Sequence, residues 1–438
     1  MKRYIFLLVI LLTAAAFAQP KLKSGPMVGY SEMREVGLWV QTTEAADVLI
    51  EYWEQGQQGK KFRTDKFTTT RHKHFTAKLI ADNVEPGKKY DYALYINNKK
   101  VSISYPLTFQ TQKLWQWRED PPPVTFVIAS CMYINEEVYD RPGKPYGSDY
   151  EILDALYKTK PDFMLWMGDN IYLREVDWNS RTGIYKRYSH MRALPQLQPL
   201  MGSVHHYATW DDHDFGPNNA DNSFTHKDKT LEAFQDFWVN PSFGINGKPG
   251  ITTRFEWADL EFFLLDNRYY RSQNERVTGK RQMFGDEQIE WLIDALKNSF
   301  APFKIVVAGG QILNPVAKWE SYSIFPEEKQ KLLSLIEKEK IPGVIFFSGD
   351  IHSSEITRLE REGTYPLYEF TVSSLTAGVS KPKPENNTAR FGIENLAEHN
   401  FGHFTVTGPR KDRVLEMKLI LKDGTVARTF TLKASELR

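Results

Sequence analysis

The sequence predicts a mixed α/β domain preceded by a small all-β sandwich. Residues 20–112 consist of short alternating runs, residues 113–123 end in three prolines, and residues 124–438 alternate apolar strands with helices. A chain of 438 residues is also too long for one compact core, so more than one domain is expected.

The first domain is predicted over residues 19–112. Runs such as VGLWVQTT, DVLIEYWE and KYDYALYIN are separated by turn-forming residues at the spacing of β-strands. The stretch NVEPGKKYDYALYINN, with a Pro-Gly turn before a tyrosine-rich strand, resembles fibronectin type III modules. We therefore expect a fibronectin-like or immunoglobulin-like sandwich.

Residues 113–123, KLWQWREDPPP, are predicted to be a stiff linker because proline can join neither a β-ladder nor a helix. The second domain is predicted over residues 124–438. Apolar runs such as VTFVIAS, DFMLWMGDN, FKIVVAGG and GVIFFSGDIH alternate there with helical patterns such as DEQIEWLIDALKN and EEKQKLLSLIEKEK. This alternation is typical of an α/β domain.

Residues 1–18 have the pattern of a cleaved signal peptide. Lys2 and Arg3 precede an apolar run, and Ala16-Phe17-Ala18 matches the preferred cleavage site, so a secreted or periplasmic protein is expected. No later run is long enough to predict a membrane span. With 56 basic and 55 acidic residues, neither a nucleic-acid scaffold nor an anionic membrane is an expected partner, and the oligomeric state is not predicted.

Polar side chains gather directly after four predicted strands. The clusters are Ser130-Cys131, Gly168-Asp169-Asn170-Ile171-Tyr172, Asp211-Asp212-His213-Asp214 and Gly349-Asp350-Ile351-His352. Most of them alone are more simply turns, but Asp211-Asp212-His213-Asp214 favours a function by itself, because three carboxylates around an imidazole repel one another. Open α/β sheets build their sites at strand ends, however, and several carboxylates brought together cannot all stay ionised without a cation. The four clusters together therefore indicate a metal centre.

Cys131 is the only cysteine in the sequence. An intermolecular disulfide, an inert buried residue, a nucleophile and a metal ligand are the alternatives for it. A nucleophilic thiol is disfavoured because the following residues, MYINEEVYD, are acidic rather than basic. A serine nucleophile is disfavoured because no G-x-S-x-G motif occurs.

The order Cys131, GDNIY, WDDHD, LLDNRYYR, DEQIEWL and FFSGDIHSSE resembles the alkaline phosphatase D family of the calcineurin-like metallophosphatases. The resemblance covers about residues 124–438. It implies a four-layer αββα sandwich, with metals between two sheets at the strand ends. It also implies an alkaline phosphatase or phosphodiesterase, and the signal-like residues 1–18 add that this enzyme is secreted. Metals at such a site would supply a bound hydroxide that attacks a phosphate ester.

The resemblance implies a set of metal ligands. Asp169 would bridge two metals, with Cys131 and Tyr172 on one of them. The other implied ligands are Asp212, Asn219, Asp350 and His352. For this family the resemblance implies ferric iron and calcium, and zinc remains possible because Cys, His and Asp all bind it.

His213 matches the family histidine that contacts the leaving group, so it is the predicted general acid. Asp214 is the second predicted catalytic residue, since Asp214 or Asp211 would hold His213. Asn170 and Arg268 are the predicted substrate-binding residues. Arg268 has the alternative of pairing with Asp266.

Two other functions are compatible with the sequence. A phospholipase-type phosphodiesterase would use the same site on a lipid. A non-catalytic glycan-binding or adhesion protein would explain the β-sandwich and the eleven tryptophans, but it would not need acidic strand ends. The natural ester, whether monoester, polymer or lipid, is not predicted.

Overall fold

The structure is a computed structural model that describes residues 21–393 and 395–438. The predicted signal peptide, residues 1–18, lies outside the described residues. In the described part of the chain, no helix has both the length and the apolar composition needed to cross a membrane.

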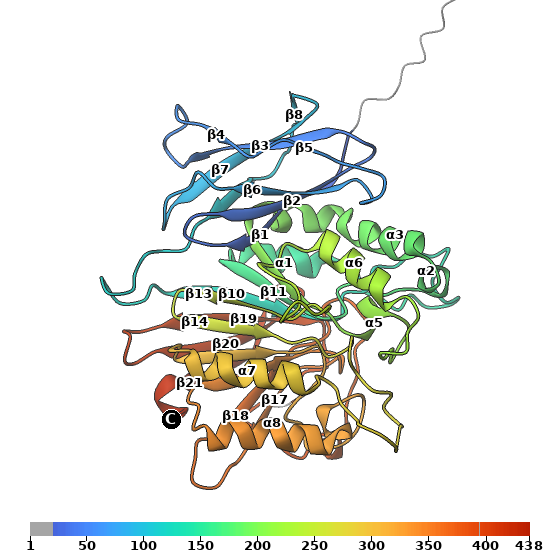
Figure 1. Ribbon diagram of the computed structural model, residues 1–438, viewed down its shortest axis with the longest axis vertical. Coiled ribbons are helices and arrows are strands. Elements are labelled where there is room, and N and C mark those ends of the chain that lie inside the picture. The colour runs from blue at the N-terminus through green and yellow to red at the C-terminus, as the bar shows by residue number, and fades with distance from the viewer. Residues whose placement is uncertain (1–20, 394) are drawn as a thin grey trace, which may run out of the picture.

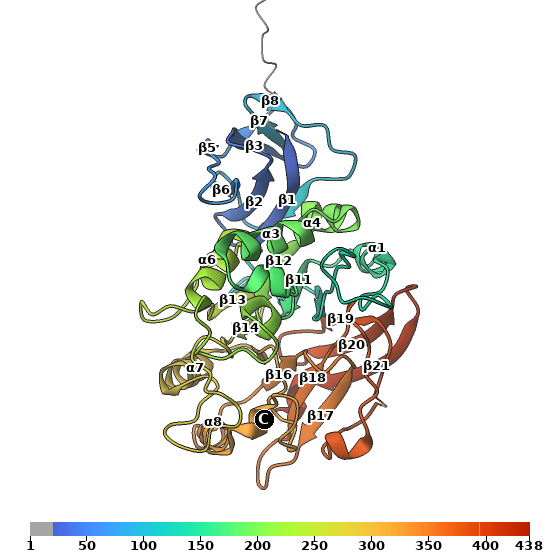
Figure 2. The ribbon, with the colours of Figure 1, turned by 90° about the vertical axis from the view of Figure 1, so that its right-hand side faces the viewer.

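The N-terminal part contains two small antiparallel layers that pack face to face (Figures 1 and 2). The layer next to the rest of the molecule consists of β1 (Leu22–Ser31), β2 (Val36–Thr42) and β6 (Thr76–Ala81). The outer layer consists of β3 (Asp47–Glu54), β4 (Phe62–Arg63), β5 (Phe67–Thr68), β7 (Lys89–Ile96), β8 (Lys99–Lys100) and β9 (Thr108–Gln110). A core that includes Leu38, Ile50, Tyr52 and Leu94 fills the space between them.

Two larger sheets form the centre of the remaining chain. The first adds β10 (Val124–Ala129), β11 (Phe163–Met167), β12 (His205–Thr209), β19 (Asn400–Thr407), β20 (Val414–Leu421) and β21 (Val426–Lys433), in the order β21-β20-β19-β10-β11-β12-β1-β2-β6. The second contains β13 (Thr253–Trp257), β14 (Leu260–Leu264), β15 (Phe303–Val307), β16 (Val344–Ser348), β18 (Leu367–Thr371) and β17 (Glu355–Leu359), in that spatial order.

Helices cover the outer faces of both sheets. The nine-stranded sheet carries α1 (Glu151–Lys158), α2 (Glu175–Trp178), α3 (Arg181–Arg192), α4 (Gln198–Ser203), α5 (Asp212–Phe215) and α6 (Lys227–Phe237). The six-stranded sheet carries α7 (Asp286–Asn298) and α8 (Pro326–Lys338). Short 3₁₀ turns lie at Pro195–Leu197, Tyr322–Ile324, Pro384–Asn386 and Ala434–Glu436.

Strand β10 shows how the layers are built. Phe126 and Ile128 belong to the core between the two sheets, whereas Val127 and Ala129 belong to the core under α1, α3, α4 and α6. Both faces of the strand are therefore buried, as expected for a parallel strand with layers on each side. The result is the predicted four-layer αββα sandwich preceded by an all-β region.

The N-terminal part and the α/β part are not connected by the predicted linker alone, because they also share a sheet. Strand β1 pairs in parallel with β12 at Val28 and His205, so the large sheet continues into the sandwich. Met27 and Trp39 also belong to the core under the helices of the α/β part. The ranges 19–112, 113–123 and 124–438 remain predicted boundaries, and they run through one continuous sheet.

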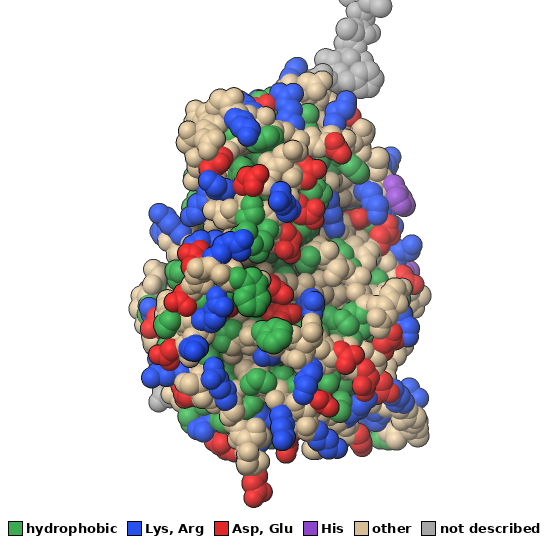
Figure 3. All heavy atoms as spheres, turned by 60° about the vertical axis from the view of Figure 1, so that its left-hand side comes forward, with side chains coloured by type: hydrophobic (Ala, Val, Ile, Leu, Met, Phe, Trp, Pro, Cys, Tyr) green, Lys and Arg blue, Asp and Glu red, His purple; other side chains and the backbone are tan. Residues whose placement is uncertain are grey.

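The outer surface carries no large region of a single charge on the face drawn in Figure 3. Basic and acidic side chains alternate there with small groups of hydrophobic side chains. This distribution agrees with the formal net charge of +1. Specific binding therefore has to come from a local site rather than from the overall field of the protein.

Candidate metal centre

The polar clusters predicted from the sequence meet at one edge of the two sheets. They follow β10, β11, β12 and β16, whose carboxyl ends point to the same edge because the neighbouring strands are parallel. The chain turns sharply after these strands. Cys131, Asp169, Asp350 and His352 all have left-handed backbone conformations, with φ of 61°, 51°, 70° and 57°. Such conformations cost about 1–2 kcal/mol each for a residue with a Cβ, so the surrounding structure must hold them.

Glycines let these turns approach one another. A Cβ on Gly309, after β15, would lie 2.4 Å from Cγ of Asp211. A Cβ on Gly349, after β16, would lie 2.3 Å from Oγ of Ser130. Side chains at either position would push the two sheets' strand ends apart and open the site.

Cys131, Asp169 and His352 form one group whose potential ligand atoms all lie within 4.8 Å of one another. Tyr172 belongs to the same group, because its hydroxyl lies 3.1 Å from Oδ2 of Asp169 and 3.2 Å from Nε2 of His352. The Cys131 thiol lies 3.7 Å from the same Asp169 oxygen and accepts a hydrogen bond of 3.0 Å from Ser373. Four of the seven predicted ligands are thus brought together.

Two further groups adjoin the first. Asp169, Asp212 and His213 form one, and Asp211, Asp212 and Asp350 form the other, each with potential ligand atoms within 4.8 Å. Asp169 belongs to both the thiol-containing group and its neighbour. This is the position expected of a carboxylate shared between two cations.

Burial and mutual repulsion make these acids hard to ionise. Burial, followed by the charges of the surrounding acids, raises the pKa of Asp169 and of Asp350 well above the usual range. Burial, and then the Asp169 charge, likewise raises the pKa of the Tyr172 hydroxyl. Burial also raises the pKa of Asp212, but His213, Arg268 and the Asn219 amide outweigh it and leave the pKa below its usual value.

Unsatisfied oxygens show that a cation fits this place. Among the described residues, Oδ2 of Asp211 and Oδ1 of Asn170, Asp212 and Asn267 are buried without a hydrogen-bond partner. All four atoms are acceptors, and a buried unpaired acceptor costs roughly 1–3 kcal/mol. An oxygen-rich group of this kind suits a hard ion such as calcium, whereas the thiol, phenol and imidazole group suits iron or zinc.

Asn219 lies beside the centre in a different way from that predicted. Its backbone N–H donates to Oδ2 of Asp212 at 2.7 Å, while its side-chain oxygen accepts a hydrogen bond from the Asn218 amide. The residue is exposed. In this structure it therefore orients Asp212 through its backbone, and a ligand role for its side chain remains a prediction.

His213 lies beside Asp169 and Asp212 and is partly buried. Its ring packs against Tyr172, with a centroid separation of 4.2 Å, and its backbone N–H donates to Oδ1 of Asp169. Burial lowers the pKa of its imidazole, although the Asp212 charge opposes this effect.

The carboxylates predicted to hold the His213 ring are used elsewhere. Asp214 accepts hydrogen bonds from the backbone N–H groups of Asn170 and Asp211, and burial raises its pKa to about 8. Asp211 accepts hydrogen bonds from Asn267 and Arg268. Asp214 therefore ties together the turns that follow β11 and β12, and it does not orient the imidazole.

Arg268 is completely buried and its guanidinium is engaged by acids. It donates to Asp211 and, through two nitrogens, to Glu320 at 3.0 and 2.7 Å. Only its backbone N–H contacts the Asp266 carboxylate. The alternative pairing with Asp266 is therefore replaced by pairing with Asp211 and Glu320, and a substrate-binding role for Arg268 remains a prediction.

Asp211, Asn267 and Glu320 are site residues whose roles the sequence did not predict. The first two lie within motifs that the sequence does show, WDDHD and LLDNR. Glu320 comes from the loop between β15 and α8, and no local pattern distinguishes it.

A cavity of about 1060 Å³ adjoins the centre. Tyr172 and His213 are the residues of the centre that line it. Its other lining residues come largely from the loop between β10 and α1 and from the region around α2, including Tyr133, Tyr139, Arg141, Lys144, Tyr146, Arg174, Glu175 and Trp178.

The comparison with protein families agrees with this geometry. The family model described as PhoD-like phosphatase matches residues 126–408, which is more than half of the chain. The chain belongs to this family. Residues 19–114 match a model described only as a domain of unknown function.

A relative within the PhoD-like group is alkaline phosphatase D of Bacillus subtilis strain 168. It is 23% identical over 369 residues, which cover 72% of this chain and 60% of the relative. The chain thus matches less than two thirds of that protein's length.

Solved structures show the same fold. A structure of PhoD matches 97% of this chain and 93% of its own, with a TM-score of 0.78 and 18% identity. The purple acid phosphatase PPD1 of yellow lupin seeds, Lupinus luteus, matches 94% of this chain and 74% of its own, with a TM-score of 0.69 and 15% identity. The predicted family and fold class are both confirmed, and a metallophosphatase fold implies metal cofactors.

Proposed function

We propose that this protein is a metal-dependent hydrolase of phosphate esters. The observation that carries the proposal is the buried group of acids, thiol and imidazole with unpaired oxygens, located at the strand ends of a PhoD-like chain. A glycan-binding or adhesion protein has no use for such a buried, mutually repelling group.

The proposed ligands divide between two cations. Cys131, Tyr172 and His352 would hold the first, Asp169 would be shared, and Asp211, Asp212 and Asp350 would hold the second. Ferric iron for the first and calcium for the second match these donors, with zinc as the alternative. When bound, the cations would neutralise phosphate charge and activate water as the nucleophile near neutral pH.

The chain's own residues supply the remaining steps. His213 faces the cavity and is placed to give a proton to the leaving oxygen of the ester. Asn170 fits a cation better than a substrate, because its amide nitrogen already donates to the Thr209 carbonyl and only its oxygen is unpaired. We therefore propose that Asn170 and Arg268 position the centre and that neither contacts the phosphate.

The proposal also covers where the enzyme acts and which classes of ester it accepts. The signal-like residues 1–18 support a secreted or periplasmic enzyme. The size of the cavity supports phosphodiesters, including phospholipids, as well as monoesters.

Chelation tests the proposed function. Protein purified without chelator is expected to hold at least one transition metal per chain and to hydrolyse p-nitrophenyl phosphate or bis-p-nitrophenyl phosphate. Prolonged chelation should remove the activity, and adding back iron with calcium, or zinc, should restore it. Elemental analysis and rates on both esters measure this outcome. Full activity in metal-free protein would show that the proposal is wrong.

Replacing Cys131 by serine tests the thiol separately. Serine keeps the small polar shape but is a much weaker ligand for a thiophilic cation. We expect the transition-metal content and kcat to fall about tenfold to a hundredfold while calcium content changes little. Ser130→Ala is the matched control, because the Ser130 hydroxyl is 3.4 Å from the thiol and donates to the Val372 carbonyl. Unchanged metal content in Cys131→Ser would mean that Cys131 is a buried residue that binds no metal.

A further inference from the structure

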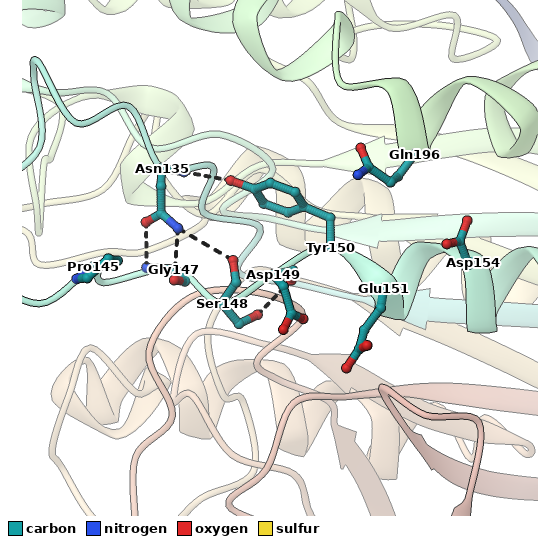
Figure 4. A pocket seen from close by; sticks show the side chains of 9 residues that line it. All are labelled: Asn135, Pro145, Gly147, Ser148, Asp149, Tyr150, Glu151, Asp154 and Gln196. Carbon is teal, nitrogen blue, oxygen red and sulfur yellow. Dashed lines mark hydrogen bonds between the residues drawn. The ribbon is translucent and has the colours of Figure 1, made fainter.

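The loop between β10 and α1 forms one wall of the cavity. Asn135 closes the base of this loop, and Figure 4 shows its hydrogen bonds where it lines a separate, neighbouring pocket. The Asn135 side-chain oxygen accepts the Gly147 N–H, its amide donates to the carbonyls of Gly147 and Ser148, and its backbone N–H donates to the Tyr150 hydroxyl. Residues 136–146 thus form a closed loop, which we call the rim loop. A loop fixed at its base can present side chains at defined positions.

The inner side of the rim loop is attached to the start of α2. Asp140 accepts hydrogen bonds from Tyr133 at 2.7 Å and from Arg174 at 3.0 Å. The Arg174 guanidinium also lies 3.8 Å from the Tyr133 ring centre. Because Asp140 and Arg174 neutralise each other, neither leaves a free charge in the cavity.

The end of the rim loop rests on a proposed ligand. The Tyr146 hydroxyl lies 3.2 Å from Nδ1 of His352, on the opposite side of the imidazole from Tyr172. The Tyr146 ring packs edge-on against Tyr133, with a centroid distance of 4.8 Å. A Cβ on Gly378 would lie 3.0 Å from the same ring. The rim loop is therefore held in place relative to the metal centre.

Arg141 and Lys144 are the cations that this arrangement leaves free. Both line the cavity and both are exposed. Neither forms an ion pair with any residue that the structure describes, whereas Glu175 is the one unpaired carboxylate described on the cavity wall. The outer part of the cavity thus has a net positive charge, while the centre itself is built from acids.

The cavity is too large for a phosphate group alone. Its volume of about 1060 Å³ is slightly above the roughly 300–1000 Å³ typical of sites that enclose whole organic ligands. Tyr133, Tyr139, Tyr146 and Trp178 supply aromatic lining beside the two free cations. Aromatic walls suit a flat organic group, and the cations suit an anion attached to it.

We propose that Arg141 and Lys144 select phosphate esters whose organic part is aromatic and carries a second negative charge. This inference rests on the proposed function, since it assigns the substrate class of the same site. The reacting phosphate meets the metal centre, so the rim-loop cations remain available for the second anion. The aromatic side chains then contact the group that joins the two.

The test compares two esters that differ by one remote charge, phenyl phosphate and 4-carboxyphenyl phosphate. Wild-type protein is expected to have the higher kcat/KM on the carboxylated ester. In Arg141→Gln/Lys144→Gln, the ratio of the two kcat/KM values should fall about fivefold, the size expected for two exposed charge contacts. The fall should appear mainly in KM and shrink at high salt. Lys338→Gln/Lys340→Gln, at the far end of α8, is the matched control and should keep the wild-type ratio.

Binding of the matching phosphonates separates this inference from the proposed function. Phenylphosphonate and 4-carboxyphenylphosphonate, titrated into metal-loaded protein by calorimetry, need no turnover. If wild-type protein hydrolyses neither ester, the proposed function is wrong, and the phosphonate affinities still decide the inference. A ratio of affinities that is equal in wild type and the double variant, or no binding of either phosphonate, would overturn it.

Discussion

Replacing Asp169 by asparagine is expected to lower kcat/KM for phosphate esters by more than about a hundredfold. Loss of residues that only support ligands costs roughly 10–100-fold in metal affinity or activity, and Asp169 is itself the proposed shared ligand. Asparagine has nearly the same shape but no charge, so both cations lose a carboxylate. Rates on p-nitrophenyl phosphate and elemental analysis of the same sample would measure the effect.

The same substitution is expected to stabilise the protein once the metals are removed. The pKa of Asp169 is raised in the folded state, so between the unfolded and folded pKa values the native state binds more protons than the unfolded state does. This carboxyl therefore subtracts stability from the metal-free protein as pH rises above about 4, its value in an unfolded chain. The Asp169→Asn substitution removes that penalty, so the Tm of the variant in chelator should exceed that of wild type at pH 8 and differ less at pH 5.

Asp177→Asn is the matched control for the predicted increase in the Tm of the metal-free protein. Asp177 is equally buried, but it accepts hydrogen bonds from Arg187 and the Arg174 backbone, and it lies outside the metal groups. Its loss should lower the Tm both with and without metal. If Asp169→Asn also lowers the Tm of the metal-free protein, then the charge of Asp169 does not destabilise the metal-free centre, and the argument from mutual repulsion is wrong.

Most of the centre could be predicted because its residues follow strands directly. Cys131, Asp169, Asp212 and Asp350 each come within three residues of the end of a buried apolar run, and parallel strands bring such positions to one edge. The family resemblance then assigned roles to them. The pairing of β1 with β12 could not be predicted, because it joins segments that are far apart in the sequence and leaves no local pattern.

The ion pairs that balance the charges of the centre could not be predicted from the sequence either. Glu320 and Arg268 are brought together by packing of the loop after β15 against the turn after β14, and each residue alone looks like an ordinary surface charge. For the same reason the sequence offered Asp214 or Asp211, both close to His213 in the chain, as the partner of its ring. In the structure, the Asp214 carboxylate instead accepts hydrogen bonds from the backbone N–H groups of Asn170 and Asp211.

Replacing Arg268 by methionine is expected to reduce the free energy of unfolding by about 3–5 kcal/mol, the range measured when one partner of a buried ion pair is removed. The completely buried guanidinium compensates Asp211 and Glu320 and lies 3.9 Å from Asp212. Methionine fills similar space but leaves these acids without their cation.

The change should also separate two sources of compensation for the acids. Added calcium is expected to recover part of the lost stability of Arg268→Met by binding Asp211 and Asp212. It should not recover all of it, because calcium does not replace the hydrogen bonds from Arg268 to Glu320. Urea unfolding with calcium and with chelator would measure both values, and Arg254→Met is the control. Arg254 pairs with Glu261 at 3.4 Å while its own side chain is 46% exposed, so its loss should cost less than about 1 kcal/mol. Equal costs for the two variants would mean that the acids around Arg268 are protonated in the folded protein, because only charged acids need the guanidinium.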